Sequence, residues 1–192
     1  PKEIRNLINL NLLSLNGNQL ETLPAEIRNL IKLKEFDLRD NQLTTLPAEI
    51  WQLTNLGYLD LSGNQFKTLS AEIWNLINLR RLSLNGNQLT ELPTEIWNLI
   101  NLKRLFLSNN KFETLPAEIC QLPNLNELHL SNNSLDSGTI ETLQKALPEC
   151  NIIEKTPEAI AAREEITKIL QSGDQAKIQK VLPIIAKWGM HV

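Results

Sequence analysis

Leucines recur along this chain at fixed positions in a frame of 23 residues. Within each frame the order Leu-x-x-Leu-x-Leu alternates apolar and polar residues, which predicts a short strand with one buried face. No single coil of this size can bury its apolar side alone, so the pattern predicts a stacked solenoid. Six copies begin at Leu10, Leu33, Leu56, Leu79, Leu102 and Leu125, with strands expected near 12–15, 35–38, 58–61, 81–84, 104–107 and 127–130.

Each frame also carries a proline and an asparagine at fixed places. The proline is expected to open a short helical turn, because its fixed φ suits the start of a helix. The asparagine follows the strand, where its amide can satisfy backbone groups that would otherwise be buried unpaired. The residue before it is Gly, Asp or Asn, which tolerate a left-handed backbone. The prolines are Pro24, Pro47, Pro93 and Pro116, with Ser70 in the same column, and the asparagines are Asn18, Asn41, Asn64, Asn87, Asn110 and Asn133.

The pattern changes after residue 135. Residues 137–147 have helical spacing, and Leu147, Cys150 and Ile152 are expected to supply a seventh strand, with Cys150 facing inward. The sequence thus predicts two domains, at 1–153 and 154–192. Because the frame begins in mid-unit with no polar N-terminal cap, further sequence is expected upstream.

The second segment is expected to hold two helices. Thr156-Pro157 looks like the start of the first, and Gly173 can end it. Pro183 should kink or split the second helix. These helices are expected to cap the C-terminal end of the solenoid, with dimerisation or docking as the alternative.

The repeats resemble a known family. Leu-Pro-Ala-Glu-Ile stands at 23–27, 46–50 and 115–119, each joined to Leu-x-x-Leu-x-Leu-x-x-Asn. This combination is similar to the LPxEI subclass of 23-residue leucine-rich repeats, found in bacterial, notably spirochaete, proteins and in animal Ras-pathway scaffolds. The near-identity of 73–79 and 96–102 is more typical of the bacterial proteins. The resemblance covers residues 1–153. It implies a right-handed α/β solenoid with a parallel concave sheet, short helical turns on the convex side, and a non-catalytic role in protein–protein recognition.

The concave surface supplies the candidate binding residues. Positions that flank the inward leucines change from coil to coil, while the framework repeats almost verbatim. Aromatic residues and arginine, the types enriched in interface cores, gather in the central coils. We therefore expect a protein partner with an acidic, partly apolar patch, such as a host or cell-surface protein. The alternative is an unused, solvated face. The expected contact residues are Tyr58, Arg81, Arg104 and Phe106, flanked by Asp37, Asp60 and His129.

Composition narrows the class of partner and the compartment. The net charge of -3 argues against nucleic-acid binding driven by overall charge. No apolar run approaches the ~20 residues that span a bilayer. Cys120 and Cys150 are expected to be free thiols, which allows a reducing compartment without requiring one. A secreted or cell-surface location is preferred to the cytoplasm, and the oligomeric state is left open.

Catalysis and metal binding are not supported. Glu127, His129 and Ser131 alternate on one strand, but residues two apart stand about 6.5–7 Å from each other with parallel side chains. No oxyanion hole or closed pocket accompanies them. The histidines and cysteines lack metal-site spacing, so no cofactor is expected.

The side opposite the strands and the C-terminal helices are two further candidate surfaces. Trp51, Trp74 and Trp97 form a stripe opposite the strands, for which packing over the core is favoured over partner binding. The alternative function is a regulatory or scaffold fragment of a larger intracellular protein that docks through its C-terminal helices.

Overall fold

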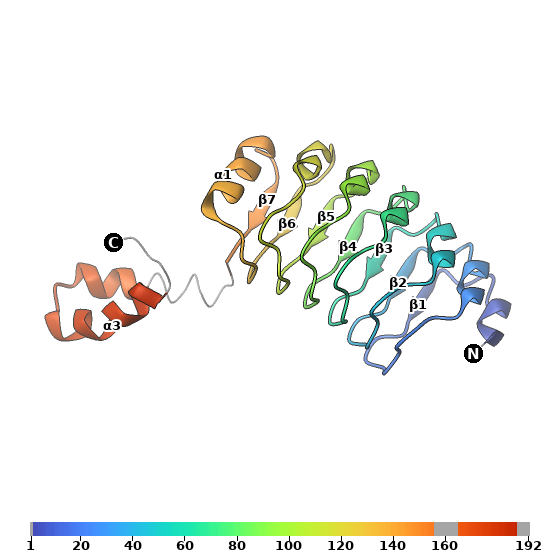
Figure 1. Cartoon of the computed structure of the whole chain (residues 1–192), viewed down its shortest axis with the longest axis horizontal. Coiled ribbons are helices and arrows are strands. Elements are labelled where there is room, and N and C mark those ends of the chain that lie inside the picture. Colours follow the sequence, from blue (N-terminus) through green and yellow to red (C-terminus); the bar gives the residue numbers. More distant parts are fainter. Residues whose placement is uncertain (1, 156–164, 188–192) are drawn as a thin grey trace. The chain divides into compact units, whose positions relative to one another are not determined.

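The computed structural model describes residues 2–155 and 165–187, with the side chains of 184–187 left out. The chain divides into two compact units, Pro1–Glu154 and Lys155–Val192. The first unit is a right-handed solenoid of stacked coils, as the repeats predicted, and its ribbons appear side by side in Figure 1.

The concave side of the solenoid is a parallel sheet. Within the described residues the sheet has seven strands in chain order, one from each coil. Across the first six strands, each residue lies opposite the residue 23 positions later in the next strand, so every column of the repeat becomes a row across the sheet. The predicted strands are confirmed, each one residue shorter than expected. Their bounds are β1 Leu12–Ser14, β2 Glu35–Asp37, β3 Tyr58–Asp60, β4 Arg81–Ser83, β5 Arg104–Phe106, β6 Glu127–His129 and β7 Asn151–Ile153.

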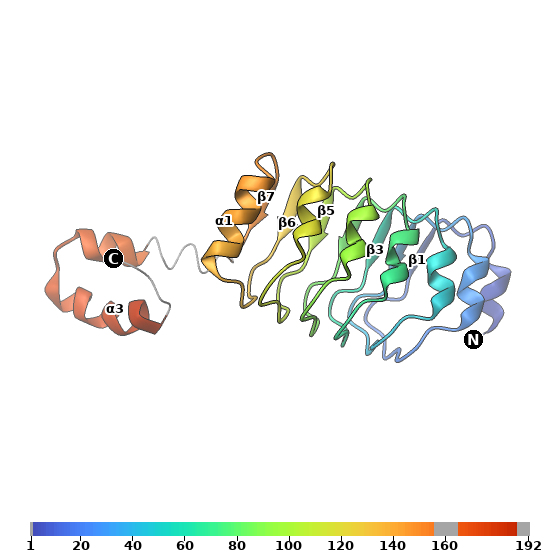
Figure 2. The same ribbon diagram turned by 45° about the horizontal axis from the view of Figure 1, so that its top comes forward.

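Short 3-10 helices form a second row beside the sheet, which Figure 2 shows most clearly. The prolines lie immediately before these helices and accept their first hydrogen bond, as at Pro47, whose carbonyl accepts from the Ile50 amide at 3.1 Å. In η4, Ser70 takes this place and its carbonyl accepts from Ile73 at 3.2 Å. The helices are η1 Lys2–Asn6, η2 Ala25–Asn29, η3 Ala48–Gln52, η4 Ala71–Asn75, η5 Thr94–Asn98 and η6 Ala117–Gln121.

The core lies between the two rows. The leucines and isoleucines of the frame are fully buried in the central coils, as Leu59 and Ile73 illustrate. Phenylalanine fills some of these positions, at Phe36, Phe66 and Phe112. Burial of such side chains contributes roughly 1.5–3 kcal/mol each, so stacking supplies most of the stability of this unit.

The asparagine column forms the hydrogen-bonded ladder that the sequence predicted. The amide nitrogen of Asn64 donates to the carbonyls of Leu38 and Leu61, both at 3.0 Å. Its oxygen accepts from the amide of Leu43, also at 3.0 Å. Asn41, Asn87 and Asn110 repeat this arrangement. Each of these four asparagines therefore pairs backbone groups of its own coil and of the preceding one.

The residue before each asparagine has a left-handed backbone, as expected. Asp40, Asn109 and Asn132 have φ values of 54°, 56° and 57°, and glycine takes the same conformation in the other coils. At Gly63, with φ of 65°, an added Cβ would also collide with the carboxylate of Asp40. Glycine therefore fits this turn without backbone strain and leaves room for the Asp40 side chain.

The last coil departs from the frame. Helix α1 (Ser137–Ala146) replaces the short turn, and the side chain of its N-cap, Asp136, accepts from the Thr139 amide at 2.6 Å. This longer helix shifts the register by one residue, so that Glu127 pairs with Asn151. The expectation that Cys150 lies within the strand is therefore wrong, whereas its expected inward orientation is confirmed. Cys150 precedes β7, although its side chain packs against the core.

The second unit has its own small core. Residues 165–171 are helical, and Gly173 follows with φ of 69°, which matches its expected role at the helix end. Helix α3 (Gln175–Lys187) contains Pro183 without being split by it. Ile166 and Val181 form the buried centre, with Ile169 and Leu170 packed against them. Thr156 and Pro157 lie outside the described residues, and the capping role of this unit stays a prediction.

Replacement of Asn64 by alanine tests the ladder. It would leave the Leu43 amide and the Leu38 and Leu61 carbonyls buried without this partner. We expect a loss of about 3 kcal/mol in the free energy of unfolding, measured by urea denaturation.

Asn18→Ala is the matched control, because Asn18 is exposed and bonds only to carbonyls of its own coil among the described residues. Its expected cost is below about 1 kcal/mol. Equal losses in the two variants would show that the ladder does not stabilise the coils by satisfying buried backbone groups.

Candidate functional site

All seven expected contact residues lie on strands β2–β6, at positions that alternate with the buried column. In β3, for example, Tyr58 and Asp60 flank Leu59, whose side chain is fully buried. The sheet register sets Tyr58 opposite Arg81, and Arg81 opposite Arg104. With two further residues these side chains form one chain of contacts, called here the concave cluster: Asp37, Arg39, Tyr58, Asp60, Arg81, Arg104, Phe106, Glu127 and His129.

Arg81 lies at the centre of the concave cluster, between two aromatic rings. Its guanidinium carbon is 5.2 Å from the Tyr58 ring centroid and 4.6 Å from that of Phe106. Such cation–π contacts hold the guanidinium in place without neutralising it. The Nε atom of Arg81 is buried and has no hydrogen-bond partner among the described residues. An unpaired buried donor costs roughly 1–3 kcal/mol.

An acidic group lies on the N-terminal side of Arg81. Arg39 binds Asp37 through Nη2 and Oδ2 at 2.8 Å and approaches Oδ2 of Asp60 at 3.6 Å. The hydrogen bond from the Arg39 side chain lowers the pKa of Asp37 to about 2. Tyr58 donates its hydroxyl proton to Asp60 at 2.7 Å. Arg39 thus offsets the repulsion between Asp37 and Asp60, which the register places opposite each other.

A second group lies on the C-terminal side. The rings of Phe106 and His129 are 4.4 Å apart between centroids and tilted by 35°. Glu127 bonds to Nε2 of His129 at 2.7 Å and to Nε of Arg104 at 3.1 Å. Every charged member of the concave cluster except Arg81 therefore has an ion-pair partner among the described residues.

Arg39 and Glu127 were not among the expected contact residues, although they complete the network. Arg39 follows Asp37 by two positions, a spacing that brings opposite charges to the same side of an extended chain. Glu127 stands opposite Arg104 once the 23-residue register is known. Both pairings could have been found by reading charges across neighbouring repeats.

Ser131 does not join His129 in a catalytic arrangement. Its side chain is buried, and its hydroxyl donates to the Ile153 carbonyl at 3.5 Å. His129 bonds instead to Glu127. Among the described residues, no group of three His, Cys, Asp or Glu side chains could hold a metal ion. The described part of the chain contains no helix long and apolar enough to cross a membrane.

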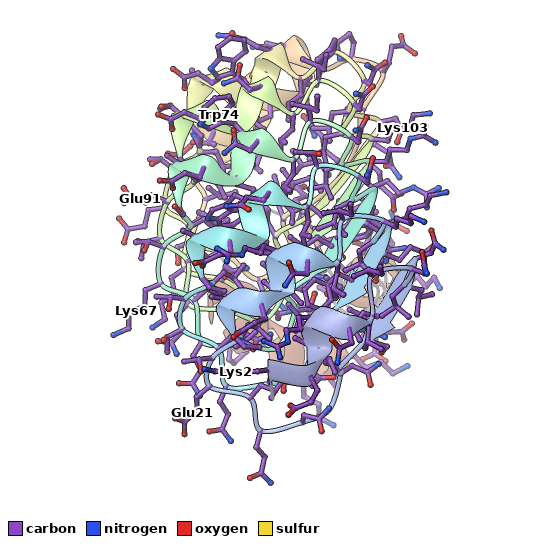
Figure 3. The ribbon with its side chains drawn as sticks, turned by 90° about the vertical axis from the view of Figure 1, so that its right-hand side faces the viewer. Lys2, Glu21, Lys67, Trp74, Glu91 and Lys103 are labelled. Carbon is purple, nitrogen blue, oxygen red and sulfur yellow. The ribbon has the colours of Figure 1, made fainter. Side chains whose placement is uncertain are left out.

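The tryptophan stripe is not uniform. Trp51 is 5% exposed and packs as expected, whereas Trp74 and Trp97 are 43% and 41% exposed. Figure 3 shows Trp74 on the side of the solenoid away from Lys103. The packing expectation is therefore confirmed for Trp51 alone of these three.

Both cysteines are free thiols, as expected. Burial, and secondarily the charge of Glu127, raises the pKa of Cys150 to about 11. Burial also raises the pKa of Cys120. Neither thiol is therefore activated as a nucleophile at neutral pH.

Comparison with known proteins assigns the repeats. A family model described as a leucine-rich repeat region matches residues 59–170, and a second leucine-rich-repeat model matches residues 8–66. A leucine-rich-repeat protein of Leptospira interrogans has a similar solved structure, with 38% identity and a TM-score of 0.58 over 79% of this chain and 50% of that one. An internalin of Listeria monocytogenes gives 26% identity and a TM-score of 0.64 over 81% of this chain and 50% of that one.

This chain therefore spans half the length of each of these two proteins. No curated protein matches it significantly in sequence.

The phenol of Tyr58 offers a direct test of the site geometry. Burial, and secondarily the hydrogen bond to Asp60, raises the pKa of Tyr58 to about 12. Because the chain contains one tyrosine, tyrosinate absorbance during an alkaline titration reports this group alone. We expect a midpoint near 12 in the folded protein and about 10 in guanidinium.

The raised pKa of Tyr58 also makes the free energy of unfolding depend on pH. The pKa of Tyr58 is higher in the folded state than in the unfolded state. The contribution of the protonated phenol to the free energy of unfolding is therefore complete below pH ~10 and disappears as the pH rises through the folded-state pKa. Asp60→Asn should lower the midpoint of the folded protein only in part, because burial remains the larger cause. A folded-state midpoint near 10, with circular dichroism unchanged, would contradict the burial and hydrogen bond of Tyr58 in solution.

Proposed function

We propose that this chain, which belongs to the leucine-rich-repeat family, is a non-catalytic recognition module that binds a protein partner through its concave cluster. Solenoids of stacked repeats offer extended concave surfaces rather than deep pockets, and members of such families generally act in protein interactions. The concave cluster occupies that surface here.

The observation that carries this proposal is the arrangement of Arg81. Tyr58 and Phe106 hold its guanidinium in a fixed position before any partner arrives. An arginine that is already ordered loses little side-chain entropy on binding. Its charge, which has no ion-pair partner among the described residues, favours a carboxylate as the partner group.

The surroundings of Arg81 favour a partner that is also partly apolar. Phe106 and His129 present a tilted pair of rings in contact beside the cation. Aromatic and arginine side chains of this kind dominate the energetics of protein interfaces. The paired charges of Arg39 and Asp37 form a polar margin, which would contribute to orientation more than to affinity. Asp60 is 3% exposed, so it supports Arg39 and Tyr58 and is not itself open to a partner.

A partner-capture experiment tests the proposal. Proteins retained by the wild-type chain are compared with those retained by an Arg81→Glu, Phe106→Ala variant, and their affinities are measured with the purified partner. Because each hot-spot truncation costs about 2 kcal/mol or more, we expect binding at least roughly 30-fold weaker. Circular dichroism checks that the inward-facing framework is unchanged.

A Lys67→Glu, Trp74→Ala variant is the matched control. It makes the same change in charge and also removes an aromatic ring, but on a side of the solenoid away from Lys103, as Figure 3 shows. This control should keep its partners. If the Arg81 and Phe106 variant keeps every partner while the control loses them, the working surface is the tryptophan side and the proposal fails.

A further inference from the structure

A second row of positions lies at the edge of the concave surface, where each residue immediately precedes a strand. These positions carry Asn11, Lys34, Gly57, Arg80, Lys103 and Asn126. The backbone of the row is uniform, since the amide of each central member bonds to the carbonyl of the member one coil earlier. Gly57 is the member of this row without a side chain, and it stands between two cations, Lys34 and Arg80.

A hollow of about 600 Å³ opens at Gly57. Because Gly57 has no side chain, this space stays open between the side chains of Lys34 and Arg80 in the two neighbouring coils. It is lined by Lys34, Glu35, Tyr58, Arg80 and the asparagines Asn55, Asn78 and Asn101. The volume falls within the range of ligand-binding clefts.

The fold does not require glycine at this position. The backbone of Gly57 is outside the left-handed region, and an added Cβ would meet the Lys34 and Asn78 carbonyl oxygens at 3.8 and 3.9 Å, which are ordinary contacts. Gly63 differs, because its backbone is left-handed and an added Cβ would collide with the Asp40 carboxylate. The hollow is therefore a surface feature that a larger side chain could fill without strain.

The charges around the hollow are unpaired. Lys34, Glu35 and Arg80 are exposed and make no ion pair or side-chain hydrogen bond with other described residues. The asparagines keep part of their capacity, since each donates one hydrogen to a carbonyl of the preceding coil, as Asn78 does to Thr54 at 2.8 Å. Two cations and one carboxylate leave a net charge of +1, which matches a carboxylate better than a dianionic phosphate.

We propose that the hollow at Gly57 receives an acidic side chain, Asp or Glu, of the protein partner. This inference rests on the proposed recognition function and extends it. The hollow is continuous with the concave cluster, because Tyr58 lines it and also contacts Arg81. A partner segment that places one carboxylate on Arg81 therefore passes the hollow, where Lys34 and Arg80 can bind a second one.

The test uses a blocked hexaglutamate peptide as the probe, with hexaglutamine as its uncharged counterpart. Amide shifts of the intact chain are followed by two-dimensional NMR at low ionic strength, where screening is weak. Hexaglutamate should shift the amides of Gly57, Tyr58 and Arg80 in a saturable manner, and hexaglutamine should not. Saturable competition by inorganic phosphate at equal affinity would overturn the assignment to a carboxylate side chain.

Two variants separate shape from charge. Gly57→Gln fills the hollow without changing the net charge, and Arg80→Gln removes one cation from its wall. Arg80→Gln should weaken peptide binding about tenfold, since a charge-assisted hydrogen bond contributes this order of affinity. Gly57→Gln should also weaken peptide binding, because its side chain would occupy the space that the glutamate needs. Lys111→Gln, which removes an exposed cation outside the hollow, is the matched control and should have little effect.

This inference would be overturned if the peptide shifts the amides of the Gly57→Gln variant as strongly as those of the wild type. It would also be overturned if the peptide shifts no amide around the hollow. The purified partner then separates the two proposals. If it binds the Gly57→Gln variant normally but not the Arg81→Glu, Phe106→Ala variant, the concave cluster is the working surface and the hollow is not part of it. If it binds both variants normally, the proposed function fails as well.

Discussion

The solenoid depends on the pairing of backbone groups that its turns bury. A chain that bends sharply after every three-residue strand leaves amides and carbonyls in the core with no strand partner, and water cannot reach them. The asparagine ladder supplies those partners, as Asn64 does for Leu38, Leu43 and Leu61. An unpaired buried amide or carbonyl costs as much as several methylene groups contribute. The leucine core can therefore form only where this pairing is complete.

The ladder and the core occupy inward positions, so the side chains at the outward strand positions are not needed to form the fold. The fold needs Leu59 and Leu82, but it does not dictate Tyr58 or Arg81. The concave cluster shows what this freedom allows: ion pairs at both ends and an unpaired cation between two rings in the middle. Side chains that contact one another across five coils also change environment together when one of them is replaced. Substitutions in the concave cluster are thus expected to be non-additive.

Much of this architecture could be read from the sequence, because the repeat converts spacing directly into register. The alternation around Leu59 predicted β3, and the asparagine column predicted the ladder. The position of Cys150 was missed, since the extra length of α1 shifts the last strand by one residue and no spacing rule anticipates it. The placement of Arg81 between two rings was also beyond the pattern, because it depends on side-chain rotamers. Trp51 and Trp74 share one column but differ in burial, and Trp51 lines a hollow beside Ser70, where the proline column is broken.

The ladder also gives the solenoid a polarity. Each asparagine completes the coil before its own, so Asn41 serves the Leu20 amide and the Leu15 carbonyl, while Asn64 serves Leu43. During synthesis, a coil that has left the ribosome still lacks these partners until the following coil emerges. Loss of the first coil removes no asparagine partner from the second, although the Gln42 amide loses the Leu20 carbonyl. Loss of the coil that carries Asn133 would leave the Phe112 amide without its asparagine partner. Completion of each of these coils thus waits for the synthesis of the coil that follows it.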